Sequence, residues 1–119
     1  MKSLYCFIVI LFLSLSLDAQ ENSQSDSVAV AQVIQNMFTA MKTSDTNLLK
    51  TCFSSTSILQ TIANKNGVIE IKNQSLQDFI NSIGKQPSGA LDERIVMDKL
   101  LIDDHLASVW TPYQFYYKS

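Results

Sequence analysis

Apolar residues recur at three- and four-residue spacing over residues 28–41, which is the spacing of one face of an α-helix. The stripe consists of Val30, Ala31, Ile34, Met37, Phe38 and Met41. Residues 25–27 (Ser-Asp-Ser) precede it and offer oxygens that cap a helix N-terminus. The pattern predicts a first helix of about four turns. Asp45 is placed to cap a second, short helix that ends near Phe53.

The apolar spacing shortens after the second helix. Residues 68–72 (Val-Ile-Glu-Ile-Lys) alternate as the two faces of a strand require. They follow residues 64–67 (Asn-Lys-Asn-Gly), a sequence typical of a tight turn in which glycine adopts a positive φ. Residues 57–63 precede the turn and contain Ile58, Leu59 and Ile62. Together the three segments predict a β-hairpin.

Ser75 opens a third predicted helix. Its side chain is placed to cap residues 76–83, and Asp78 lies three positions later, as in a capping box. Gly84 follows the last apolar residue of the pattern, where a helix commonly ends.

The chain is strand-like from Leu91 to its end. Residues 94–102 are rich in Ile, Val, Met and Leu, residues 103–105 (Asp-Asp-His) are typical of a tight turn, and residues 106–117 return as a second strand. Helices are therefore segregated from an antiparallel sheet, which predicts an α+β fold. Residues 28–119 are enough for one domain.

The first 27 residues have a different composition. Residues 1–19 combine a positive start, an unbroken apolar run from Leu4 to Leu13 and a small residue, Ala19, at the expected cleavage point. This is the layout of a secretory signal peptide. The run is shorter than the roughly 20 residues that span a membrane. Residues 20–27 are wholly polar and predict a disordered leader. We expect a secreted or periplasmic protein without membrane contact after cleavage.

Charge and composition narrow the range of partners. The chain has 9 Lys and Arg, 11 Asp and Glu and a net charge of −2, with no basic run. This argues against nucleic acid as a partner. The three glycines are isolated and form no phosphate loop, and the lone His105 beside two Asp is not a metal-ligand set. We expect no metal and no cofactor. Cys52 is the one cysteine after residue 19, so we expect a buried, unpaired thiol.

Several segments resemble the nuclear transport factor 2-like superfamily, which includes SnoaL-like polyketide cyclases and ketosteroid isomerases. They are residues 33–41 (Val-Ile-Gln-Asn-Met-Phe-Thr-Ala-Met), Ser44-Asp45, Leu49 and Phe53. Residues 103–113 (Asp-Asp-His-Leu-Ala-Ser-Val-Trp-Thr-Pro-Tyr) are similar to a hairpin of exported bacterial members of the lumazine-binding type. The resemblance covers residues 28–117. It implies a cone-like, curved antiparallel sheet with three helices from the N-terminal half packed on its concave face.

The same resemblance implies further strands. Members of the superfamily usually continue with two more strands after the segment that corresponds to residues 106–117. We therefore expect the cone to be incomplete at its C-terminus and the chain to be a fragment of a longer product. The crowding of aromatic residues at the end of the chain supports this expectation, because an edge strand this apolar invites aggregation.

The catalytic residue of the ketosteroid isomerases does not carry over. Those members use a carboxylate on the strand after the second helix, and the matching residues 57–61 (Ser-Ile-Leu-Gln-Thr) contain no Asp, Glu or His. Asp98 is the nearest substitute, since it shares a predicted strand face with Val96, Leu100 and Ile102. The alternative is a solvated Asp98 at a sheet edge, which we favour because charged residues are seldom buried unpaired.

Aromatic residues near the C-terminus are the remaining feature. Trp110, Tyr113 and Phe115 are expected to line a ligand pocket with Phe38 and Met41 of the first helix. Equally, they are expected to form core and a sheet face that pairs two copies into a homodimer.

These observations favour an exported, non-catalytic cone domain that binds a small apolar or aromatic ligand or self-associates. The first alternative is a SnoaL-like isomerase, cyclase or hydrolase that uses Asp98. The second alternative is a protein-interaction module that pairs through its sheet.

Overall fold

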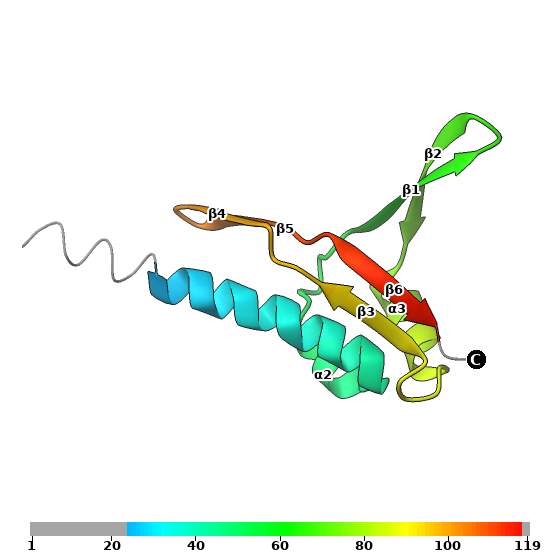
Figure 1. Cartoon of the computed structure of the whole chain (residues 1–119), viewed down its shortest axis with the longest axis horizontal. Helices are drawn as coiled ribbons and strands as arrows, with labels where there is room; N and C mark the ends of the chain where they lie inside the picture. The colour runs from blue at the N-terminus through cyan, green and yellow to red at the C-terminus, as the bar shows by residue number, and fades with distance from the viewer. Residues whose placement is uncertain (1–23, 118–119) are drawn as a thin grey trace, which may run out of the picture. The chain divides into compact units, whose positions relative to one another are not determined.

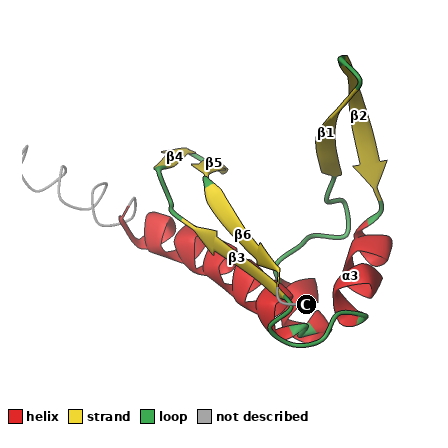
Figure 2. Cartoon of the chain, turned by 45° about the vertical axis from the view of Figure 1, so that its right-hand side comes forward, coloured by secondary structure: helices red, strands yellow, loops and turns green. Residues whose placement is uncertain are grey.

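The computed structural model describes residues 24–117 of the chain (Figure 1). A first helix covers residues 24–43. The other elements are α2 (Thr46–Thr51), β1 (Leu59–Lys65), β2 (Val68–Gln74), α3 (Leu76–Gly84), β3 (Leu91–Ile95), β4 (Lys99–Asp103), β5 (Leu106–Trp110) and β6 (Tyr113–Tyr117). The strands pair antiparallel in three two-stranded sheets, β1 with β2, β3 with β6 and β4 with β5 (Figure 2). The predicted α+β class is confirmed.

Internal contacts divide the chain into two compact units. Of the described residues, the first unit holds 24–32 together with 97–111, and so contains the start of the first helix and the β4–β5 hairpin. The second unit holds residues 33–96 and 112–117. The single domain expected for residues 28–119 stays a prediction. Among residues 24–117, no helix combines the length and hydropathy needed to cross a membrane.

The first helix begins earlier than predicted. Residues 24–27 are helical, so the helix starts within the segment expected as a leader, and residues 25–27 lie inside the helix rather than ahead of it. The expected signal peptide and residues 20–23 lie outside the described residues. The apolar stripe of residues 28–41 falls within the helix, as its spacing requires.

Asp45 caps α2 as predicted. Its Oδ1 accepts hydrogen bonds from the backbone N–H groups of Asn47 and Leu48, both at 3.0 Å. Ser44 reverses the chain between the two helices with a positive φ of 58°. Both features depend only on residues adjacent in sequence.

Ser75 caps α3, also as predicted. Its Oγ accepts from the N–H of Asp78 at 3.1 Å and donates to Asp78 Oδ2 at 2.6 Å. Gly84 is the last residue of α3, as predicted, and the C-cap residue Lys85 is in the right-handed helical region. A Cβ on Gly84 would lie 2.8 Å from Cγ2 of Thr46. Glycine at this position therefore allows α3 to approach α2 closely.

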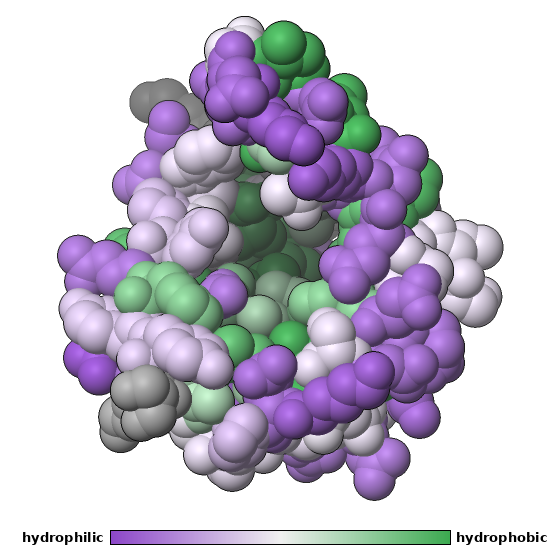
Figure 3. Space-filling model, turned by 90° about the vertical axis from the view of Figure 1, so that its right-hand side faces the viewer, coloured by the Kyte–Doolittle hydropathy of each residue, from purple (hydrophilic) through white to green (hydrophobic). Residues whose placement is uncertain are grey.

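The β1–β2 hairpin turns at Asn66 and Gly67, as predicted. Both residues have positive φ, 54° and 84°, which defines a type I′ turn between the paired Lys65 and Val68. Every residue of β2 is exposed, including its apolar ones. Figure 3, with this hairpin uppermost, shows apolar side chains at its surface among hydrophilic ones.

The long C-terminal hairpin is interrupted, which corrects the continuous strands predicted over residues 94–102 and 106–117. Residues 96–98 and 111–112 separate its strands into two pairs. The N–H of Val96 donates to the Pro112 carbonyl at 3.0 Å, but Pro112 has no N–H to return. This pair therefore keeps one ladder hydrogen bond instead of two, and the regular strands end here. The predicted turn is confirmed, with Asp104 and His105 between the paired Asp103 and Leu106.

The core lies where the first helix, α2 and α3 meet in the second unit. Its buried residues are Ala40, Met41, Leu49, Ile80 and Ile83. Phe53 and Phe79 pack at its border in an edge-to-face pair, with ring centroids 6.0 Å apart. Leu91 brings the start of β3 against the same core.

Candidate functional site

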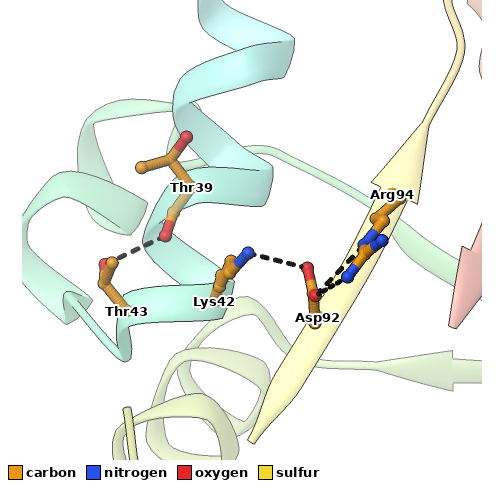
Figure 4. Close-up of polar contacts among 5 residues, drawn as sticks. All are labelled: Thr39, Lys42, Thr43, Asp92 and Arg94. Atoms are coloured by element: carbon orange, nitrogen blue, oxygen red, sulfur yellow. Dashed lines mark hydrogen bonds and ion pairs between the residues drawn. The ribbon is translucent and has the colours of Figure 1, made fainter. Parts of the chain in front are cut away.

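Asp92 on β3 is the one buried charged residue of the described chain, with 4% of its surface exposed. Its carboxylate is held by two cations from different elements (Figure 4). Lys42 of the first helix places Nζ 3.0 Å from Oδ1. Arg94, two positions along β3, donates from Nε and from the guanidinium NH2 group to Oδ2, at 3.2 and 3.0 Å. We call Lys42, Asp92 and Arg94 the charge cluster.

The cluster fixes the ionisation of its members. Hydrogen bonds from Lys42 and Arg94 lower the pKa of Asp92 below its usual value of 3.8, and the bond from Lys42 has the larger effect. The hydrogen bond to Asp92 in turn raises the pKa of Arg94. Asp92 is therefore an ionised acceptor with its lone pairs in use, a poor candidate for accepting a proton from a substrate.

Arg94 extends the cluster to β6. Its guanidinium lies over the Tyr116 ring, 4.3 Å from the centroid. Tyr116 is the register partner of Asp92 across the β3–β6 pair, and its hydroxyl donates to Gln114 Oε1 at 2.9 Å. The cluster thus ties the first helix to both strands of this sheet.

An open pocket of about 350 Å³ lies beside the charge cluster. It is lined by Gln35, Phe38, Thr39 and Lys42 of the first helix and by residues 92–95 of β3. Burial raises the pKa of Glu93 above its usual value of 4.5. The pocket offers one aromatic ring, two cations already shared with Asp92 and the Glu93 carboxyl. These groups suit reversible binding of a small molecule.

Sequence reasoning did not identify the charge cluster. Asp92 and Arg94 are two positions apart, so their side chains lie on the same face of a strand. This spacing of opposite charges could have been recognised in the sequence as an ion pair. Lys42 carries no such signal, since its proximity to Asp92 depends on how the first helix packs on β3.

The structure places the predicted ligand-binding residues in different surroundings. Phe38 lines the pocket beside the charge cluster, whereas Met41 belongs to the buried core. Tyr113 lines a second open pocket of about 410 Å³, with Arg94 and Pro112 among its neighbours. Met41 is only 8% exposed, and its contact with a ligand stays a prediction.

Trp110 and Phe115 are both strongly exposed. Trp110 ends β5 in the first unit, and Phe115 is the central residue of β6 in the second. The Phe115 ring lies 6.4 Å from that of Tyr117, its neighbour on the same strand face.

Asp98 is exposed and lies between β3 and β4 rather than within a strand. Its backbone N–H donates to the Trp110 carbonyl at 3.0 Å. This position fits the solvated alternative better than a carboxylate among apolar neighbours. That no turnover depends on Asp98 stays a prediction.

The other reactive groups are isolated. His105 is exposed at its turn, with Nε2 3.7 Å from Asp104 Oδ2. Cys52 is half-buried, and its Sγ donates to the Leu48 carbonyl at 3.4 Å. Within residues 24–117, no three His, Cys, Asp or Glu side chains converge as metal ligands would.

Strand β6 is the most extensively aromatic exposed element of the described chain. Tyr113, Phe115, Tyr116 and Tyr117 are 63%, 48%, 43% and 62% exposed. Among the described strands β6 pairs only with β3, so its other backbone edge has no strand beside it. We call this side of β6 the aromatic edge.

Comparisons of the chain with protein-family models, with curated proteins and with solved structures found no significant match.

Proposed function

We propose that this protein is an exported, non-catalytic domain that acts by binding through its sheet, and that its main binding event is self-association. The aromatic edge carries this proposal. Four large aromatic side chains stand exposed on one five-residue strand, beside backbone groups that no described strand pairs. Exposed aromatic surface beside a free strand edge is typical of an interaction site.

The polar groups support binding rather than catalysis. Asp92 is committed to two cations, and Asp98 is exposed between β3 and β4. An isomerase, cyclase or hydrolase of the SnoaL-like type that uses Asp98 is therefore the less favoured alternative.

The cone of the nuclear transport factor 2-like superfamily is part of this proposal. Its support is the order of the elements, in which two helices, a hairpin, a third helix and a long hairpin follow one another. In a cone, the apolar residues of the β1–β2 hairpin and of β6 belong to a larger curved sheet. The exposure of Ile62 and Ile69 supports further packing against this hairpin.

Export is the remaining part of the proposal. The apolar run of residues 4–13 and the polar segment behind it support cleavage near Ala19. Mass analysis of the exported fraction tests this directly. A mature chain that begins near Gln20 is expected, and an intact Met1 in that fraction would refute export by cleavage.

Light scattering coupled to size exclusion tests self-association. We expect the purified protein to approach twice the mass of one chain as its concentration rises. A mass of one chain at every concentration would overturn the proposal.

A second candidate function is the binding of a small ligand with an aromatic or apolar body. The pocket beside the charge cluster favours it, because Phe38 lines the pocket together with Lys42 and Arg94 and its volume is within the range of ligand sites. Benzoate is a suitable probe, since it joins an aromatic ring to a carboxylate. Calorimetric titration should give binding heat that Phe38→Ala removes, and equal heats for both proteins would reject the pocket as a site.

A further inference from the structure

We propose that self-association uses one edge in one register: β6 pairs antiparallel with β6 of a second copy, with Phe115 opposite Phe115 of the partner subunit. This inference rests on the proposed self-association and specifies its geometry. It follows from the direction of the backbone groups of β6 and from the residues that the strand carries.

The pairing of β6 with β3 determines which backbone groups of β6 are free. Because the Val96 N–H donates to the Pro112 carbonyl, these two residues form a hydrogen-bonded pair of the ladder. Hydrogen-bonded and non-bonded pairs alternate along an antiparallel ladder. In the register of β3 with β6, Gln114 and Tyr116 therefore direct their N–H and C=O groups toward β3.

The backbone groups on the outer edge of β6 consequently come from its three odd-numbered residues. Tyr113, Phe115 and Tyr117 direct their N–H and C=O groups away from β3. None of these groups has a partner strand among the described residues. The edge offers alternating donors and acceptors, as a further antiparallel strand requires.

A second copy satisfies all of these groups in one register. With Phe115 on a two-fold axis, Tyr113 faces Tyr117 of the partner subunit and Tyr117 faces Tyr113 of the partner subunit. Each such pair exchanges two hydrogen bonds, which gives about six in total. A shift of two residues leaves one pair unmatched and reduces the number to about four. The symmetric register is therefore the preferred one.

The side chains of β6 are compatible with this symmetry. Tyr113, Phe115 and Tyr117 share one strand face, so the pairing sets aromatic rings opposite aromatic rings. No residue of β6 is charged, so no like charges meet across the axis. A second copy is thus a self-complementary occupant of this edge.

The other strands are less suited to such pairing. Charged residues occur in β1, β2, β3 and β4, and charged side chains on a strand discourage edge-to-edge pairing. Strand β5 is uncharged but has one aromatic residue, Trp110. Among the described strands, only β6 is both uncharged and almost entirely aromatic.

Two matched double variants of the whole chain test the register. Tyr113→Lys with Tyr117→Lys places like charges opposite each other twice, whereas Tyr113→Lys with Tyr117→Glu places opposite charges there. Both variants lose the same two tyrosines. We expect the dimer dissociation constant of the Lys/Lys variant to exceed that of the Lys/Glu variant about tenfold at low salt. Equal constants would overturn the register.

Cysteine cross-linking gives a second test that does not depend on charge. A hydrogen-bonded pair has Cα atoms about 5.5 Å apart, within the range of a disulfide. Phe115→Cys should therefore give a dimer linked through residue 115 under mild oxidation, identified by mass analysis of the linked peptide. Gln114→Cys is the control, because position 114 faces position 116 of the other copy and should not link to itself.

The outcomes separate this inference from the proposed function. If the wild-type protein is monomeric at every concentration, both fail. If it is a dimer but the Phe115→Cys variant does not link through residue 115, the dimer uses another surface and only the register fails.

Discussion

At the scale of single residues, the charge cluster makes stability depend on pH. The pKa of Asp92 is lowered in the folded protein, so below 3.8 the unfolded chain binds this proton more readily than the folded one. Asp92 therefore stabilises the folded protein above pH 3.8, and this stabilisation is lost as pH falls through its lowered pKa. Glu93 acts in the opposite direction, because burial raises its pKa. Glu93 contributes to the stability of the folded protein below pH 4.5, and this contribution is lost as pH rises through its raised pKa.

Asp92→Asn should lower the unfolding temperature at neutral pH, because it leaves Lys42 and Arg94 without their shared carboxylate. The difference from wild type should shrink as pH falls below 3.8 and through the lowered pKa of Asp92, where the wild-type carboxylate also becomes neutral in the folded protein. Glu93→Gln is the control on the same strand, and its unfolding temperature should not fall at neutral pH. Melting curves over a pH series check both, and a constant Asp92→Asn deficit at all pH values would contradict the assigned ion pair.

Gly84 leads to a second prediction at this scale. In an open helix, replacing glycine by alanine stabilises by up to about 1 kcal/mol. Here the new Cβ would lie 2.8 Å from Thr46 Cγ2. We therefore expect Gly84→Ala to destabilise the protein by about 1–3 kcal/mol, as overpacking does.

A double-mutant cycle identifies the cause. Thr46→Ser removes the methyl group that the new Cβ would meet, so the pair Gly84→Ala/Thr46→Ser should recover much of the loss in urea unfolding. If Gly84→Ala raises stability on its own, the close approach of α2 and α3 is wrong.

At the scale of the elements, the sequence was most informative where structure depends on near neighbours. The caps at Asp45 and Ser75 and the turn at Asn66 and Gly67 involve contacts over two or three residues, and all were predictable. The interruption at Pro112 was missed, although a missing N–H in a strand is a readable signal.

Contacts between distant segments could not be predicted in the same way. The ion pair between Lys42 and Asp92 depends on how the first helix packs against β3, which no local pattern specifies. The burial of Met41 is similar, because an apolar stripe shows that a helix face is covered but not whether protein or ligand covers it.

The cap of α3 gives a prediction at this scale. Ser75→Ala removes the oxygen that accepts the Asp78 N–H and should lower the free energy of unfolding by about 1 kcal/mol. Ser82→Ala is the matched control, since Ser82 is exposed in the same helix and bonds the Phe79 carbonyl rather than an N-terminal N–H. Equal effects of the two substitutions in urea unfolding would show that the cap is not what stabilises this helix end.

At the scale of the whole molecule, the described residues bury a small core and leave much apolar surface on the strands. Five apolar side chains form the buried cluster, whereas β6 and the β1–β2 hairpin keep large apolar residues exposed. Contiguous exposed apolar surface is uncommon on proteins that remain monomeric. Association through the aromatic edge would cover part of this surface without any change in the fold.

Residue-resolved amide hydrogen exchange at increasing protein concentration tests this account most directly. The Phe115 N–H points away from β3 and is hydrogen-bonded only when a second strand arrives, whereas the Gln114 N–H is bonded to β3 at any concentration. We expect exchange at Phe115 to slow as concentration rises, while Gln114 stays protected throughout. Exchange at Phe115 that is equally fast at every concentration would contradict self-association through this edge.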